Sequence, residues 1–89
     1  MVSGKVKIIN KLGIHLRPAT LLSKNAIEFQ SNISLKKGTS LVNVKSVLGV
    51  LGACVKQNDE VEIICDGPDE EEAYKKIVKL IEDGLGDHQ

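Results

Sequence analysis

The chain has 89 residues, of which 42% are hydrophobic, so it can form one small domain with a modest core. Only two residues are aromatic, which argues against the base-stacking surfaces of single-stranded nucleic-acid binding. Twelve basic and twelve acidic residues cancel, and we infer that no global field attracts nucleic acid or an anionic membrane. No apolar run approaches the roughly 20 residues of a membrane span, and the N-terminus lacks the core of a signal peptide.

The first half of the chain predicts a strand, a helix and a hairpin. In KVKIIN, Val6 and Ile8 alternate with lysines, which indicates a half-buried strand. From Leu16 to about Gln30 apolar residues recur every three or four positions, which predicts an amphipathic helix. The next segment, SNISLKKGTSLVNVK, alternates on both sides of Gly38 and predicts a hairpin with its turn at that glycine.

The second half predicts a short helix, a strand and a long helix. Ser46 is a natural N-cap for one or two helical turns in SVLGVLGAC. DEVEIICDG alternates and predicts a fourth strand. The last helix opens with Asp69 and Glu72 in an arrangement like a capping box, has lysines after its leading acids, and ends at Gly84 and Gly86.

The two cysteines, Cys54 and Cys65, lack the spacing of a metal site and are too few for a disulfide framework. We interpret both as buried thiols in a reducing compartment. The expectation is therefore a cytoplasmic protein with a single domain over residues 1–89 and neither a metal nor a cofactor.

The predicted element order is βαββαβα. Strands that alternate with helices of this length favour an α+β fold in two layers, with the helices on one face of an open antiparallel sheet. Polar alternates such as Lys5, Lys36 and Glu62 suit the other face, which would meet solvent. This architecture supports many functions, so function has to be inferred from particular sites.

The segment GIHLRPAT, residues 13–20, places the only arginine of the chain two residues after an interior histidine; the other histidine, His88, adjoins the C-terminal residue. Pro18 costs little in the first turn of a helix, because its missing N–H has no helical partner there. His15 is therefore expected at or just before a helix N-terminus. Free backbone N–H groups and the helix dipole favour an anion at such a place, and they favour the neutral, nucleophilic ring of His15. Arg17 adds a guanidinium that can bind two phosphate oxygens at once, so the segment predicts a phosphoryl-accepting site.

Each of these residues also has an ordinary explanation. A lone histidine is most often a surface or capping residue, a lone arginine a solvated charge, and a proline a common first-turn residue. No Cys, His or Asp lies at ligand spacing from His15, which argues against a metal site. No nucleophile motif supports a Ser–His–Asp triad. The phosphoryl hypothesis depends on three features coinciding at one predicted helix N-terminus.

A second informative segment is VKSVLGVLG, residues 44–52. Val47, Leu48 and Leu51 would share one face of the short helix, while Val50 points elsewhere. A helix this short cannot bury both faces, so one apolar face is expected to form a docking surface, unless these residues simply cap the core. Ser46 is either an N-cap alone or also a phosphorylation site, whose charge a helix N-terminus would tolerate.

GIHLRPAT together with VNVKSVLGVLG resembles the HPr family, the histidine phosphocarriers of the phosphoenolpyruvate:sugar phosphotransferase system. The match runs from Val6 to about Leu85. The resemblance implies an open-faced β-sandwich with four antiparallel strands and three helices. It also implies that His15 takes phosphate from enzyme I and gives it to IIA domains of sugar permeases, while Arg17 stabilises the phosphoryl group. Such a protein is a carrier and not a stand-alone catalyst.

The resemblance further implies regulation at Ser46, the position that HPr kinase/phosphorylase modifies in Gram-positive bacteria to create a partner of catabolite control protein A. The presence of His15 argues against a Crh-type paralogue, which lacks the phosphorylatable histidine. Leu16 stands where the family commonly has a small residue, and Leu48 and Leu51 stand where methionines are frequent. These departures leave open a regulatory or nitrogen-type paralogue.

A shuttle must release both donor and acceptor, so we expect a small, weak interface and a monomeric protein. The predicted rim of that interface consists of Leu16, Thr20, Lys24, Lys45, Val47, Leu48 and Leu51. Two other functions are considered: a regulatory binding module in which only Ser46 acts, and a small-molecule-binding module unrelated to phosphate.

Overall fold

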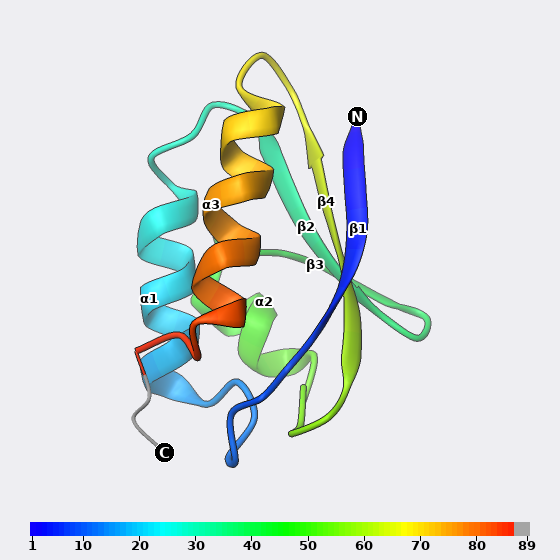
Figure 1. Cartoon of the computed structure of the whole chain (residues 1–89), viewed down its shortest axis with the longest axis vertical. Helices are drawn as coiled ribbons and strands as arrows, with labels where there is room; N and C mark the ends of the chain where they lie inside the picture. The colour runs from blue at the N-terminus through cyan, green and yellow to red at the C-terminus, as the bar shows by residue number, and fades with distance from the viewer. Residues whose placement is uncertain (87–89) are drawn as a thin grey trace.

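Strands with one apolar side and helices with one apolar stripe pack into two layers (Figure 1). The structure is a computed structural model that describes residues 1–86, so His88 lies outside the described residues. In chain order its elements are β1 (Val2–Lys7), α1 (Leu16–Ala26), β2 (Asn32–Lys37), β3 (Ser40–Asn43), α2 (Val47–Gly52), β4 (Glu60–Asp66) and α3 (Glu70–Glu82). The predicted βαββαβα order is confirmed.

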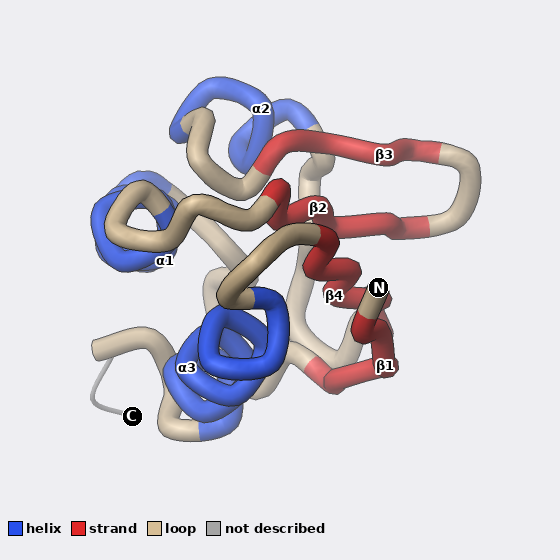
Figure 2. The backbone as a smooth tube through the Cα atoms, turned by 90° about the horizontal axis from the view of Figure 1, so that it is seen from above, coloured by secondary structure: helices blue, strands red, loops and turns tan. Residues whose placement is uncertain are grey.

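The four strands form one sheet in the order β1-β4-β2-β3, and every neighbouring pair is antiparallel. Figure 2 shows the three helices on one face of this sheet, as predicted. Across the β1–β4 pair, Lys5 lies opposite Glu62 and Lys7 opposite Glu60, all four being on the face without helices. Opposite charges at directly paired positions stabilise this register.

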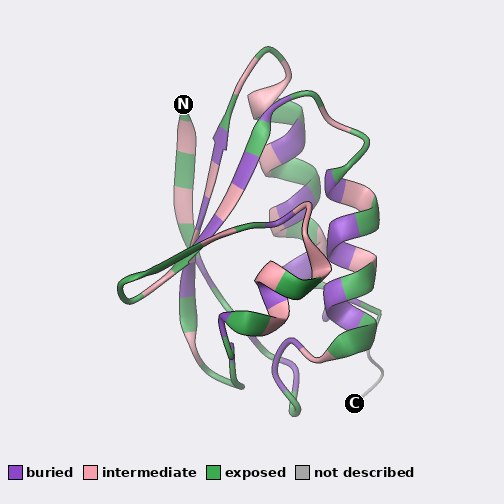
Figure 3. Cartoon of the chain, turned by 180° about the vertical axis from the view of Figure 1, so that it is seen from behind, coloured by how far each residue is buried: buried purple, intermediate pink, exposed green. Residues whose placement is uncertain are grey.

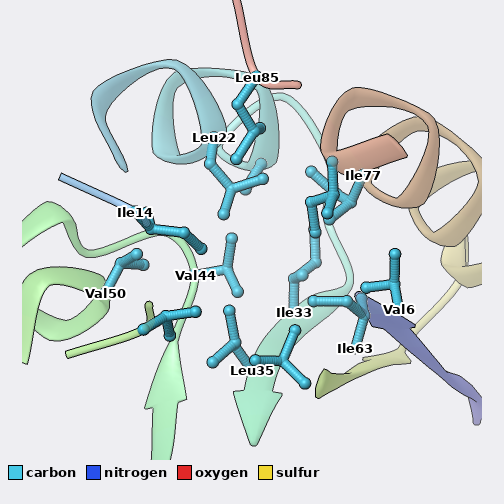
Figure 4. Packing of buried hydrophobic residues seen from close by; sticks show 14 of the residues in the cluster. Val6, Ile14, Leu22, Ile33, Leu35, Val44, Val50, Ile63, Ile77 and Leu85 are labelled. Carbon is cyan, nitrogen blue, oxygen red and sulfur yellow. The ribbon is translucent and has the colours of Figure 1, made fainter. Parts of the chain in front are cut away.

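The core lies between the two layers, where the inward side chains of sheet and helices meet (Figure 3). Leu22 of α1 and Ile77 of α3 lie over Ile33, Leu35 and Ile63 of the sheet, and all five are almost completely buried (Figure 4). Burying one such side chain contributes about 1.5–3 kcal/mol. These few residues therefore hold both long helices on the sheet.

Helix α1 ends at Ala26, so the expected continuation to about Gln30 is wrong. The N–H groups of Glu28 and Phe29 bond three residues back, to the carbonyls of Asn25 and Ala26, which tightens the last turn. The next two N–H groups, of Gln30 and Ser31, donate to the carboxylate of Asp69, both at 2.9 Å. The carboxylate of Asp69, which is distant in sequence, thus replaces the backbone carbonyls that would accept these N–H groups if the helix continued.

The capping-box expectation for α3 is also wrong. Asp69 is the residue before the helix, but its side chain caps no N–H of α3, because it is committed to Gln30 and Ser31. Glu70 instead accepts a hydrogen bond from the N–H of Gly67 at 3.1 Å, and its other oxygen accepts one from the Met1 ammonium at 2.9 Å. The acids in the first turn and Lys79 in the last turn complement the helix dipole as expected.

The interpretation of both cysteines as buried thiols is half correct. Cys65 is buried within β4, and burial raises the pKa of its thiol. Cys54 is exposed: it follows α2 with a φ of 53°, a left-handed conformation. Asn58 also has a left-handed conformation, at a φ of 72°, in the turn before β4.

The link between Asp69 and the loop after α1 predicts a pH-dependent stability. The hydroxyl of Ser31 and the N–H groups of Gln30 and Ser31 hold the pKa of Asp69 below its usual value. A lowered folded-state pKa gives stability that is present above the unfolded-state pKa, near 4, and is lost as the pH falls through the folded-state pKa. Asp69→Asn should lower the melting temperature at pH 7 and narrow the difference between pH 7 and pH 3.

Glu71→Gln is the matched control for thermal unfolding monitored by circular dichroism at both pH values. Glu71 lies two residues further along and is exposed. An equal change in melting temperature in both variants would show that the pH dependence comes from the total charge of this segment and not from the Asp69 hydrogen bonds.

Candidate functional site

His15 is the N-cap residue of α1, which confirms its expected position. Its backbone is extended, at φ −89° and ψ −166°, and its carbonyl accepts the N–H of Ala19 at 2.9 Å. The side chain of His15 is half-buried, while Pro18 in the first turn is fully buried. The imidazole is therefore presented at the start of a helix whose first turn is fixed in the core.

The loop before His15 is held against the segment between α2 and β4. The N–H of Ile14 donates to the carbonyl of Val55 at 3.0 Å, and the Ile14 side chain enters the core beside Val50 (Figure 4). Gly13 has a φ of 67°, and a Cβ built on it would lie 2.1 Å from the Val55 oxygen. Only glycine fits this contact, so the backbone on the N-terminal side of His15 has little freedom.

Arg17 and its neighbours on α1 form one wall of a hollow on the surface. The hollow has a volume of about 490 Å³. Its lining consists of Leu16, Arg17, Thr20, Leu21, Lys24, Leu85 and Gly86. Within residues 1–86 no carboxylate pairs with the exposed guanidinium of Arg17, so it is available to an anion at this surface.

Leu85 and Gly86 also line this hollow, which could not be predicted from the sequence. Gly84, Leu85 and Gly86 all have positive φ angles, which fold the chain back under α1 and bury Leu85. The glycines signal the end of α3, but no local pattern shows which helix the turn will reach. That proximity is tertiary, and sequence spacing does not contain it.

Ser46 is the N-cap of α2, as predicted: its hydroxyl oxygen accepts the N–H of Gly49 at 3.0 Å. Val50 is completely buried, whereas Leu48 is 81% exposed. Val47 and Leu51 are half-buried against the core. The expected exposed apolar face of this helix therefore consists mainly of Leu48.

The predicted rim residues differ in how accessible they are. Leu16, Thr20 and Lys24 are exposed along α1, which contacts α2. Lys45 is half-buried, and its ammonium donates to the carbonyl of Phe29 at 2.7 Å. A partner would have to compete with this bond, so Lys45 is less available than Lys24, the other cation of the predicted rim.

Charge is strongly segregated, and the cancelling totals conceal this. Residues 1–58 contain nine of the twelve basic residues and, of the twelve acidic residues, only Glu28. The first turn of α3, with its three glutamates, lies at the end of the molecule opposite the N-terminus of α1 (Figure 1). The zero net charge, from which we inferred that no global field acts, therefore does not mean that the charges are evenly distributed along the chain.

Two other properties bear on the kind of site. Within the described residues, no group of three His, Cys, Asp or Glu side chains is arranged to hold a metal ion. None of the helices in residues 1–86 is long and apolar enough to cross a membrane.

Comparison with known families agrees with this geometry. The family model described as the PTS HPr component phosphorylation site matches residues 2–83. The chain belongs to the HPr family. Members of this family are phosphocarriers of the phosphotransferase system and not stand-alone catalysts.

The relatives include two kinds of HPr-family protein. The chain is 38% identical to phosphocarrier protein HPr of Treponema pallidum (strain Nichols), over 92% of this chain and 93% of the relative. It is 36% identical to HPr-like protein Crh of Bacillus subtilis (strain 168), over 93% of this chain and 98% of that one. The crystal structure of HPr-C-His from Thermoanaerobacter tengcongensis superposes with a TM-score of 0.95 at 39% identity, and each chain is fully covered. Dimeric forms of an HPr and of Crh are also among the similar structures.

The contact of Gly13 with Val55 predicts a large effect of a single methyl group. Gly13→Ala should destabilise the fold by more than about 1 kcal/mol, because the new side chain needs a left-handed φ and also collides with backbone. Chemical denaturation measures this effect.

Gly38→Ala is the matched control, since Gly38 has a similar φ of 61° but open space where the Cβ would lie. Gly38→Ala should show only the free-energy cost of placing an alanine at a left-handed φ. Equal destabilisation by both substitutions would contradict the role given to the Val55 contact.

Proposed function

We propose that this protein carries phosphate in a phosphoenolpyruvate:sugar phosphotransferase system, with His15 as the acceptor. The main observation in support is the position of His15 at the N-terminus of α1, two residues before the exposed Arg17, in a chain of the HPr family. The donor is enzyme I, charged by phosphoenolpyruvate, and the acceptors are histidines of IIA domains of sugar permeases.

The transfer needs little chemistry from the carrier itself. A ring nitrogen of His15, Nδ1 by analogy with the family, forms a bond to phosphorus as the bond to the donor breaks; the reverse step passes the group on. The guanidinium of Arg17 stabilises the charge on the transferring oxygens. Catalysis is mainly positioning in a transient complex, and for that reason a fixed loop before His15 is useful.

The docking surface proposed for both partners combines apolar and cationic side chains. Leu16 and Leu48 are 64% and 81% exposed, and Arg17 and Lys24 border the hollow next to Leu16. Carboxylates on the partner would complement these cations and speed the encounter. A surface this small supports fast release, in keeping with a monomeric shuttle.

A regulatory role of Ser46 is a second candidate function. Its hydroxyl lies at the N-terminus of α2, two residues before Leu48. A phosphate there would keep the helix capped and place negative charge beside the apolar contact, which disfavours an acidic partner. The proposed partners in this role are HPr kinase/phosphorylase and catabolite control protein A, in line with the catabolite-repression relative Crh.

Between the two kinds of relative, His15 favours an HPr-type carrier over a Crh-like protein, because only a carrier needs a phosphorylatable histidine. Enzyme I and the IIA domains act in the cytoplasm, so we place the protein there. No nucleic-acid or membrane contact and no cofactor is part of this function.

Phosphorylation at His15 is tested with phosphoenolpyruvate and enzyme I. The protein should gain one phosphate that is lost in acid, and His15→Ala should gain none. Arg17→Lys should slow transfer about tenfold, the equivalent of one charge-assisted hydrogen bond in the transition state. Mass spectrometry and quenched-flow kinetics measure these outcomes.

Ser46→Ala serves as the matched variant in this assay and should accept phosphate normally. An acid-labile phosphate on His15→Ala would disprove the assignment of the acceptor.

Regulation at Ser46 is tested with ATP and HPr kinase/phosphorylase. The protein should gain an acid-stable phosphate that Ser46→Ala lacks, and the phosphorylated form should have a higher KM with enzyme I. Because the N-cap is also lost, Ser46→Ala should be less stable by about 1 kcal/mol. A competent kinase that leaves Ser46 unmodified would reduce this residue to an N-cap.

A further inference from the structure

Ser23 is a buried hydroxyl on α1 that belongs to none of the sites described above. It is only 2% exposed, on the face of α1 that packs in the core. A hydroxyl in such a place is destabilising unless it is hydrogen-bonded. Thr20 and Asn25, two other polar side chains of α1, bond to carbonyls one turn earlier in their own helix. The Ser23 hydroxyl instead donates to the carbonyl of Lys45, 22 residues away, at 2.7 Å.

The carbonyl that Ser23 holds belongs to the peptide unit between Lys45 and Ser46. The N–H of the same unit, that of Ser46, donates to the carbonyl of Asn43 at 3.0 Å. A peptide unit is planar, so hydrogen bonds to its oxygen and from its N–H fix the orientation of the plane. The Cα of Ser46 lies in that plane. The two bonds therefore set the position from which the Ser46 side chain projects.

The side chain of Ser46 is oriented by a third hydrogen bond. Its oxygen accepts the N–H of Gly49 at 3.0 Å, and this bond does not use the hydroxyl proton. The oxygen can therefore act as a nucleophile once a base takes the proton. Because Ser46 is half-buried, a kinase can approach this oxygen only from the open side, and the orientation of the hydroxyl decides how well it meets the phosphorus.

We infer that Ser23 is a positioning residue for the phosphorylation of Ser46: its hydrogen bond to the Lys45 carbonyl holds the Ser46 hydroxyl in the orientation that a kinase requires. This inference rests on the proposed regulatory role of Ser46. In the transfer, the Ser46 oxygen forms a bond to the γ-phosphorus of ATP while the bond from that phosphorus to ADP breaks, and the hydroxyl proton passes to a base on the kinase. Ser23 takes no part in these bond changes. It raises the fraction of bound protein in which the oxygen points at the phosphorus.

The test is steady-state phosphorylation of Ser23→Ala by HPr kinase/phosphorylase and ATP, at a temperature at which the variant is folded. The kcat for Ser46 should fall about fivefold, the equivalent of one neutral hydrogen bond, while KM stays unchanged because no exposed residue is altered. Amide hydrogen exchange at Ser46 should become faster in Ser23→Ala, because its peptide unit has lost one of two bonds. Exchange at Ala19, near the start of α1, should change less. A loss of overall stability alone would speed exchange at both positions alike and leave kcat unchanged.

Asn25→Ala is the matched control. The Asn25 amide donates to the carbonyl of Leu21 at 2.8 Å, so this substitution also removes a side-chain hydrogen bond of α1 but not the bond to Lys45. A kcat of Ser23→Ala equal to that of the unaltered protein, or an equal fall in Asn25→Ala, would overturn the inference and leave Ser46 as a phosphorylation site. If a competent kinase leaves the unaltered protein unmodified, the proposed regulation itself fails, and this result is distinct because it appears without any variant.

Discussion

The packing of the loop 8–14 on the segment 55–59 is the constraint on which the position of His15 depends. Backbone hydrogen bonds join Ile8 to Asp59 and Asn58, and Ile14 to Val55, while Gly13 fits against the Val55 carbonyl with no room for a side chain. Because the next residue, His15, is the N-cap of α1, the same contact sets where the helix starts. The site is thus fixed by backbone bonds between two segments that are 41 or more residues apart, and the side chains of Ile14 and Pro18 anchor it in the core on either side of His15.

The distribution of charge also affects how this site can meet a partner. The basic residues of β1 face acidic residues of β4 across the sheet, and Lys37 pairs with Asp59, so much of the charge in the sheet is compensated locally. Arg17 and Lys24 of α1 have no acidic counterpart within their own helix, since Glu28 is the first acid of the chain. A protein with zero net charge can therefore still present cations of α1 to an acidic partner.

The periodic features of the fold could be predicted from the sequence, whereas features that depend on tertiary contacts could not. Alternation predicted the four strands, and the convergence of His15, Arg17 and Pro18 predicted a helix start. The end of α1 was missed because the N–H groups of Gln30 and Ser31 bond to Asp69, which lies 38 or more residues away. The same commitment of Asp69 explains why no capping box forms. Leu85 lines the hollow because of a turn after α3, and the local sequence pattern does not encode the direction of that turn. The total charge of zero also gave no sign of how the charges are distributed along the chain.

The neighbours of Leu16 explain why a large apolar side chain stands directly after His15. Leu16 is the first residue of α1, so its carbonyl is tied into the helix and accepts the Thr20 hydroxyl at 2.7 Å, while its side chain stays exposed over the hollow floored by Leu21 and Leu85. In the proposed transfer complex, a partner that covers Leu16 would remove water from this hollow. Water exclusion would strengthen the attraction between Arg17 and a phosphoryl group, so an apolar neighbour would make the single guanidinium more effective than it is in solvent.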